Sequence, residues 1–363
     1  MRGVSTIRPL EREDLSAVAR IVAVALPSAA RRGEGLERFL ADITLDHPWA
    51  DPEIPSLVGV GDDGRIAGAV AVHARRLLVG DRTVTAACCS HLVVDPDAPA
   101  GALGARILAR FMGGPQELSY SDTAIEVVAR VWQAAGGRVE QGRSTTWVRP
   151  LRPLVWGGRM AAGLVRRKTA SGLAPVGAMP MAFEAGRRLR HPGSGPAPAP
   201  TTGERLAAAP LRPEDLVEHG PAITGWTDVR AAWDDEFARW TFAALERRHG
   251  AGNVVGRLLR RGETPVGWYV YLRSGAGQGR VLQLAARRRE VDAVVGELFA
   301  AAREAGIVLL RGRIEPHLAE ALRARHCALG FGDRFVMHGD TDLLARLESP
   351  ASLLTKLDGE WWA

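Results

Sequence analysis

The sequence predicts an α/β protein in which helices cover both faces of a mixed sheet, and it predicts this arrangement twice. Three observations support the prediction. Strand-like and helix-like segments alternate, an opening motif returns after about 200 residues, and residues 88–114 form a strand, a glycine turn and a helix in the predicted order. The length of 363 residues favours two domains, and a hydrophobic content of 46% suffices for packed cores.

The opening motif is TIRPLEREDL at 6–15, and PLRPEDL at 210–216 repeats it. Each copy is a short extended piece followed by acidic residues. Carboxylates favour a helix start because they lie at the positive end of the helix dipole. The repeat predicts two copies of one domain rather than a solenoid.

The same order of elements follows in each half, with hairpin turns at 61–64 and 261–263. The expected strands are 57–60, 66–78, 83–94 and 117–120 in the first half, and 254–259, 266–272, 280–285 and 307–311 in the second. The expected helices are 101–112, 123–135 and 291–305.

The helix expected at 123–135 has its own start and stop signals. Thr123 and Glu126 form a predicted capping box, and Gly136 ends the helix. Its predicted buried face comprises Ile125, Val128, Ala129 and Trp132.

Residues 88–114 organise the first half. The strand 88–94 ends at Asp95-Pro96, because proline cannot continue a strand ladder, and an amphipathic helix follows. Gly101 and Gly104 lie between them, where free backbone N–H groups at a helix start can bind a phosphate. The alternative is a short connection that needs glycine only for its backbone angles.

The order of elements, the opening IRPLEREDL and the stretch from LVVDP to GALGARIL resemble the GNAT family of N-acetyltransferases, in a tandem form with two such domains. The resemblance covers 1–150 and, more faintly, 206–345. It implies an N-terminal domain at 1–150 with the acyl-CoA site, a basic connector with a Pro/Gly-rich linker at 151–205, and a degenerate C-terminal domain at 206–363.

The resemblance also implies site residues and acetyl-CoA as co-substrate. The strand backbone that would bind the pantetheine arm belongs to Leu92, Val93 and Val94. The turn that would hold the pyrophosphate comprises Ala100, Gly101, Ala102, Leu103, Gly104, Ala105 and Arg106. The family turn usually begins with Arg or Gln, where this chain has Gly101, so one basic contact is missing. Arg106 and Arg110 are candidates to replace it.

Acyl transfer to an amine needs a base that accepts a proton and an acid for the departing thiolate. His91, on the pantetheine-side strand, is the predicted base; a packed histidine is the alternative. The family often has a tyrosine where this chain has Trp132, which is expected to be a packing residue. Tyr120 is therefore the predicted acid, with a core tyrosine as the alternative. Cys88 and Cys89 are expected to be buried rather than nucleophilic.

The basic excess is local. Residues 151–205 hold nine basic and two acidic residues, a net +7, whereas the whole chain carries +6. This distribution speaks against a nucleic-acid-binding face on the folded parts. Residues 154–168 could form a basic helix on an anionic membrane surface; the alternative is a helix packed between the domains.

Three cysteines make no disulfide framework, no metal site is expected, and no apolar stretch is long enough to span a bilayer. The predicted location is cytoplasmic. In the second half, residues 287–290 lack glycine, so that turn is a poor phosphate site. Trp361 and Trp362 are expected to dock on a domain or a partner.

Three functions follow as hypotheses. The first is an acyl-CoA-dependent N-acyltransferase that moves an acetyl group to an amine of a small molecule or peptide. The second is a non-catalytic tandem protein that binds coenzyme A or a partner. The third is a membrane-surface accessory protein in envelope or polysaccharide assembly.

Overall fold

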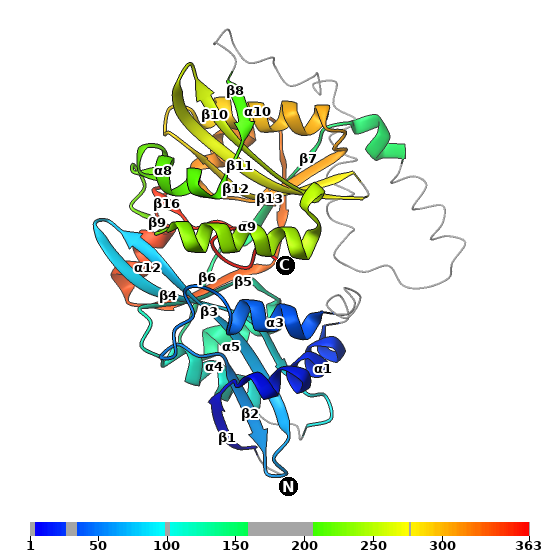
Figure 1. Cartoon of the computed structure of the whole chain (residues 1–363), viewed down its shortest axis with the longest axis vertical. Coiled ribbons are helices and arrows are strands. Elements are labelled where there is room, and N and C mark those ends of the chain that lie inside the picture. Colours follow the sequence, from blue (N-terminus) through cyan, green and yellow to red (C-terminus); the bar gives the residue numbers. More distant parts are fainter. Residues whose placement is uncertain (1–3, 27–34, 99–101, 159–205, 276, 363) are drawn as a thin grey trace.

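The computed structural model describes residues 4–26, 35–98, 102–158, 206–275 and 277–362. The first half of the chain lies below the second in Figure 1, and the C-terminal end lies between them. No helix in these ranges is both long enough and apolar enough for a membrane span.

The described residues of the first half form seven strands and four α-helices. In chain order they are β1 (Val4–Pro9), α1 (Leu15–Ala25), α3 (Leu36–Thr44), β2 (Leu57–Gly61), β3 (Ile66–Val79), β4 (Arg82–Val94), α4 (Leu103–Met112), β5 (Leu118–Ala124), α5 (Glu126–Ala134), β6 (Arg138–Glu140) and β7 (Thr145–Pro150).

The second half repeats this series with additional short elements. They are β8 (Ala207–Pro210), α8 (Pro213–Thr224), β9 (Val229–Ala231), α9 (Asp235–His249), β10 (Val254–Arg261), β11 (Thr264–Ser274), β12 (Gln278–Ala286), α10 (Val291–Glu304), β13 (Leu309–Arg313), α11 (Ala319–Ala324), β14 (Ala328–Phe331), β15 (Arg334–Gly339), α12 (Thr341–Glu348) and β16 (Ser352–Leu353). The mixed α/β class and the expected strands of both halves are confirmed.

The two sheets exchange strands. The first has the order β1-β2-β3-β4-β5-β15-β6, with β9 beside β3, and the second has the order β14-β7-β13-β12-β11-β10-β8. Thus β15, from the second half, lies between β5 and β6, while β7, from the first half, lies between β13 and β14. Each sheet is completed by the other half of the chain. The domain boundaries at 150 and 206 stay a prediction.

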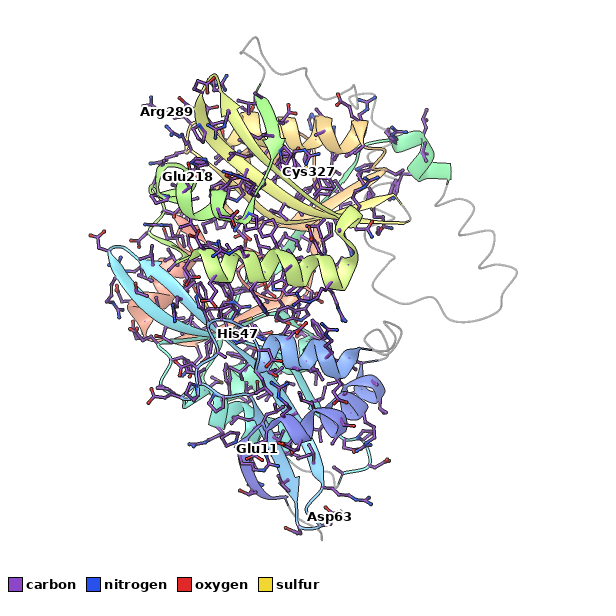
Figure 2. All side chains as sticks on the ribbon, in the orientation of Figure 1. Glu11, His47, Asp63, Glu218, Arg289 and Cys327 are labelled. Atoms are coloured by element: carbon purple, nitrogen blue, oxygen red, sulfur yellow. The ribbon has the colours of Figure 1, made fainter. Side chains whose placement is uncertain are left out.

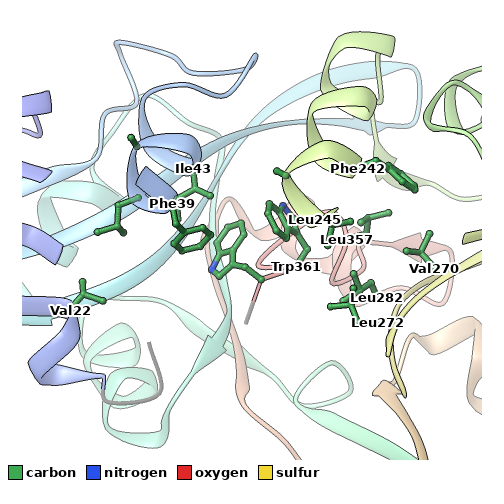
Figure 3. Close-up of a cluster of buried hydrophobic side chains, with 14 of the residues drawn as sticks. Val22, Phe39, Ile43, Phe242, Leu245, Val270, Leu272, Leu282, Leu357 and Trp361 are labelled. Atoms are coloured by element: carbon green, nitrogen blue, oxygen red, sulfur yellow. The ribbon is translucent and has the colours of Figure 1, made fainter. Parts of the chain in front are cut away.

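Helices cover both faces of each sheet. In the first sheet α4 and α5 pack on one face, and α1 and α3 pack on the other. The α1/α3 face shares one continuous apolar cluster with α8, α9 and the inner face of the second sheet. Figure 3 shows Phe39 and Ile43 on one side of this cluster, Phe242 and Leu245 on the other, and Trp361 between them. The predicted docking of the two tryptophans is confirmed, since Trp361 and Trp362 are 1% and 2% exposed.

The repeated motif has the same local structure in both halves. Asp14 accepts the backbone N–H of Glu11 and pairs with Arg8 at 2.6 Å. Asp215 accepts the backbone N–H of Arg212 and pairs with its guanidinium at 2.7 Å. The acidic residue of each motif therefore lies at a helix start, as predicted, and also closes the turn there.

The predicted capping box of α5 is wrong. The helix begins at Glu126 after Ile125, and Thr123 still belongs to strand β5. The Thr123 hydroxyl donates to the distant carboxylate of Glu360 instead, so it does not cap the helix. Ile125 is 57% exposed rather than buried, whereas Ala129 and Trp132 are buried as predicted.

Candidate active site

Strands β4 and β5 separate after a short parallel pairing. The paired positions are Ala86 with Leu118, Ala87 with Ser119, and Cys88 with Tyr120. Beyond Cys88, β4 runs on to Val94 without pairing to β5, and all residues of both strands are described. Backbone N–H and C=O groups on the separated edge can therefore bind an extended ligand, because a strand edge offers alternating donors and acceptors.

A bulge interrupts β4 within this separation. Ala71 pairs with Ser90 and Ala69 pairs with Val93, so His91 and Leu92 together oppose one residue of β3. The φ angle of His91 is +49°, in the left-handed region. For a residue other than glycine, this backbone conformation costs about 1–3 kcal/mol of conformational free energy, and such strained residues are concentrated at functional sites. The bulge redirects the His91 side chain and the neighbouring backbone.

His91 lies on the α3 face of the sheet and is half-buried. Its ring packs edge-on against Phe39 at a centroid distance of 6.0 Å. The Ser90 hydroxyl lies 2.8 Å from His91 Nδ1. The structure thus places the predicted base at the separation of the strands, with a hydrogen-bonded ring.

The start of α4 lies beside the end of β4. Ala102, the residue before this helix, has no side chain that can cap it, and the first turn holds no acidic residue. The N–H groups of Leu103, Gly104 and Ala105 consequently have no acceptor within the helix, which makes them suitable donors for a phosphate. A Cβ added at Gly104 would lie 3.4 Å from Val94 Cγ2, so the turn and the strand end are in contact.

Two glycines of the sheet allow α4 to lie this close. A Cβ at Gly59 would come within 2.7 Å of Leu103 Cδ1, and one at Gly68 would come within 3.2 Å of Leu103 Cδ2. These glycines were not among the predicted site residues, although a glycine inside a strand is a signal of close approach. The nearby carboxylate of Asp95 pairs with Arg20 at 2.8 Å, which offsets its charge.

The remaining predicted coenzyme residues occupy different positions. Val93 is 4% exposed and buries its side chain in the core, so only its backbone is available to a ligand. Leu92 and Val94 are half-buried, and Arg106 is exposed. Ala100 and Gly101 lie outside the described residues, and Ala102 is the residue before α4.

Tyr120 lies at the last paired position of β4 and β5, directly before the two strands separate. Its ring is fully buried and stacks on Phe335 at 5.8 Å, and its hydroxyl donates to the Asp358 carbonyl oxygen at 3.0 Å. Burial raises the pKa of Tyr120 well above its ordinary value of 10, so the hydroxyl keeps its proton. Burial likewise raises the pKa of Cys88 and Cys89, so neither is a thiolate nucleophile.

Residues 355–362 form a segment that the sequence analysis did not connect with the site. The Glu360 carboxylate accepts hydrogen bonds from the Ser121 hydroxyl at 2.8 Å, from the Asp122 backbone N–H at 3.0 Å and from Thr123. Burial and then the charge of Asp122 raise the pKa of Glu360 to about 7. The only sequence signal was a pair of acids among apolar residues, Asp358 and Glu360, which is weak.

A buried ionic network ties this segment to the second sheet. Arg313 pairs with Asp122 at 3.0 Å and with Glu315 at 3.0 Å, and Lys356 pairs with Asp122 at 3.0 Å. All four side chains are largely or wholly buried, so removal of one partner would leave an uncompensated charge. The network holds β5 against the second half just where β5 leaves β4.

Comparisons with known proteins bear on the fold. No family model matches the sequence, and the search of curated proteins gives no match. Among solved structures, the chain is similar to a probable N-acyltransferase from Enterococcus faecalis (TM-score 0.57, 8% identity, 92% of this chain and 72% of that one covered). It is also similar to a GCN5-related N-acetyltransferase from Anabaena variabilis (0.57, 11% identity, 92% and 72% covered).

A third similar structure is Saccharomyces cerevisiae N-myristoyltransferase with bound myristoyl-CoA, at a TM-score of 0.50 and 12% identity, with 92% of this chain and 81% of that one covered. At such low identities the likeness concerns the fold. The chain therefore has the fold of the GNAT superfamily, in a tandem form with two sheets.

Proposed function

We propose that the chain is an acyl-CoA-dependent N-acyltransferase whose active site lies at the separation of β4 and β5. The observation that carries the proposal is the conjunction of an open strand edge, an uncapped start of α4 and an imidazole on a strained bulge. The open strand edge suits the amide-bearing arm of a coenzyme A thioester, and the start of α4 suits its anionic pyrophosphate. The imidazole can act as the base for an amine that attacks the thioester carbonyl.

In the proposed reaction the acceptor amine attacks the thioester carbonyl carbon. The new N–C bond forms, His91 takes the ammonium proton, and the C–S bond breaks as the tetrahedral intermediate collapses. The thiolate leaves and takes a proton, so the products are an amide and free coenzyme A. Tyr120, which keeps its proton at neutral pH, is the proposed donor.

We propose acetyl as the acyl group because the closed end of the separation is filled. Tyr120 binds Asp358 there, and Glu360 binds β5. A Cβ at Gly359 would lie 2.6 Å from Asp122 Oδ2, so the segment is tightly packed against β5. A long acyl chain would have to displace these contacts.

The test is thiol release by purified protein with acetyl-CoA and a panel of amines, compared with octanoyl- and myristoyl-CoA. We expect turnover with acetyl-CoA and an amine together, and slower turnover as the chain lengthens. Binding of coenzyme A without turnover by any amine would instead support a non-catalytic binder, for which the missing Arg or Gln at Gly101 is the motivating observation.

We also propose peripheral membrane contact through 154–168. Leu154, in this stretch, is 91% exposed.

A further inference from the structure

Two side chains beside His91 have no part in the proposed reaction so far. His73, on β3, lies opposite Cys88, and Ser90 lies two residues further along β4, so the two are diagonal neighbours on the same face. His73 is 1% exposed and Ser90 is 4% exposed. Both are polar groups in the core, and such groups persist only when hydrogen-bonded.

These side chains form one hydrogen-bonded chain. His73 Nδ1 binds the backbone carbonyl oxygen of Ile43, on α3. His73 Nε2 lies 3.0 Å from Ser90 Oγ, which in turn lies 2.8 Å from His91 Nδ1. The chain therefore runs from a main-chain carbonyl, through two buried side chains, to the predicted base.

The bulge makes this chain possible. In a regular strand, successive side chains point to opposite faces, so Ser90 could not reach the ring of His91. The left-handed φ of His91, +49°, brings its ring to the face of Ser90 and Phe39. The strained residue and the hydrogen bond thus have one structural cause.

The direction of each hydrogen bond follows from the Ile43 carbonyl oxygen, with which the series begins. A carbonyl oxygen can only accept, so His73 carries a proton on Nδ1. Burial, the charge of Arg75 and the nearby ring of His47 hold the pKa of His73 well below its ordinary value of 6.5, so His73 is neutral and its Nε2 accepts. Ser90 must then donate its proton to His73, which leaves the Ser90 oxygen to accept from His91 Nδ1.

We propose that His73 and Ser90 are positioning residues that hold His91 in the tautomer with a proton on Nδ1, so that Nε2 is its basic atom. The inference deepens the proposed function and rests on it for its catalytic meaning. The tautomer of His91 itself depends only on the hydrogen bonds among His73, Ser90 and His91, whether or not the protein is an enzyme. A base that presents one defined nitrogen needs no rearrangement before it accepts the proton of the amine.

The primary test is nitrogen-15 NMR of the full chain labelled at histidine. We expect His91 Nδ1 to resonate as a protonated nitrogen and Nε2 as an unprotonated one at a pH where the ring is neutral. Ser90→Ala should redistribute His91 between its two tautomers and lower the rate of acyl transfer by about 10-fold, a typical cost of losing an orienting hydrogen bond to a histidine. Ser90→Thr, which keeps the hydroxyl, should restore both.

Ser56→Ala is the matched control. Ser56 is also a buried serine beside β3, but its hydroxyl binds only the backbone of Val72. Its loss should cost stability without changing the His91 tautomer. The proposal is overturned if wild-type His91 carries its proton on Nε2, or if Ser90→Ala leaves the tautomer as it was. If His91 has the expected tautomer but no acyl transfer occurs, the proposed function is refuted and the positioning of His91 by His73 and Ser90 still stands. The two failures are therefore distinguishable.

Discussion

The two halves of the chain open their sheets in the same way but fill the opening differently. In the second half, β12 and β13 pair in parallel only from Gln278 with Leu309 to Arg280 with Arg311, and then separate. The Leu282 carbonyl there accepts the backbone N–H of Leu357 at 3.1 Å. Gln283 binds Trp268 and Thr355, so side chains and the segment 355–362 occupy this opening.

The space left in the second opening is small. Its cavity measures about 20 Å³, which is room for one water molecule, and Gln283, Arg313 and Glu315 are among its lining residues. In addition, the residue before α10 is Glu290, which pairs with Arg261, whereas the residue before α4 is Ala102 and the first turn of α4 holds no acid. Figure 2 shows Arg289, from the same turn, at the outer end of the second half and His47 where the two halves meet.

Under the proposed function, the second half keeps the separation of its strands without keeping a binding site. Strand separation is a backbone property that the fold preserves. A binding site also needs polar backbone that the protein does not use itself. In the second half the Leu282 carbonyl of β12 is used by Leu357, whereas in the first half Asp358 and Glu360 bind β5. Coenzyme A should therefore bind the first half alone.

The largest expected effect is on coenzyme binding. Gly104→Glu should abolish binding of coenzyme A, because a carboxylate in the first turn of α4 would oppose the pyrophosphate. Gly104→Ala is the steric control, since its Cβ makes only an ordinary contact with Val94. Calorimetry that shows unchanged affinity for Gly104→Glu would refute this placement. In the second half, Asp292→Asn at the matching position of α10 should leave the affinity unchanged.

The next largest effect concerns the base. His91→Ala should lower the rate of transfer by about 100-fold, because the amine then loses its general base. The wild-type rate should rise with pH as the base loses its proton, and this rise should be absent from the variant. pH–rate profiles of both proteins provide the measurement; equal rates would mean that the amine arrives already neutral.

A smaller effect is expected at the proposed acid. Tyr120→Phe should slow the release of coenzyme A by about 10-fold while leaving its affinity intact, since the ring stays and the hydroxyl is lost. The stability cost should be about 1 kcal/mol, because Arg75 still donates to the Asp358 carbonyl. Single-turnover kinetics and denaturant unfolding separate these two consequences. If only stability changes, Tyr120 is a core residue.

A further prediction concerns the contact of Glu360 with β5. The pKa of Glu360 in the folded chain, about 7, lies above its ordinary 4.5, so the folded protein binds the extra proton between these values. The contribution of Glu360 is therefore most favourable below pH 4.5 and is lost as the pH rises to about 7. Glu360→Gln should remove this dependence. The melting temperature of the variant minus that of the wild type should be about 2 °C higher at pH 8 than at pH 5. Parallel melting curves for the two proteins would contradict the assignment.

The smallest expected effect is at the membrane. Deletion of 154–168 should weaken any association with anionic vesicles at low salt, because this stretch carries several of the connector's basic residues. Flotation with neutral vesicles is the control. Wild-type protein that does not float with anionic vesicles would leave the stretch a packed or solvated segment.

Local sequence patterns were sufficient for the hairpins and the central strands of each half, but they did not give α3, β15 or α12. The largely apolar segment 66–78, the turn at 61–64 and the amphipathic segment around Gly104 are local patterns, so they predicted β3, its hairpin and α4 without any knowledge of contacts. The same holds for Trp132, whose place on an apolar helix face predicted a packing role, and it is fully buried against Phe111. Local signals failed at Thr123, where a bond to Glu360 replaced the expected cap.

The site depends on contacts that are distant in sequence. That His91 lies beside Ser90 follows from the chain order, but that both reach His73 follows from a bulge whose register only the paired strands define. The exchange of β7 and β15, and the occupation of the second opening by 355–362, join residues more than 70 positions apart. Residue periodicity reports which face of an element is buried, whereas the partner that buries it is chosen by the packing of the whole chain.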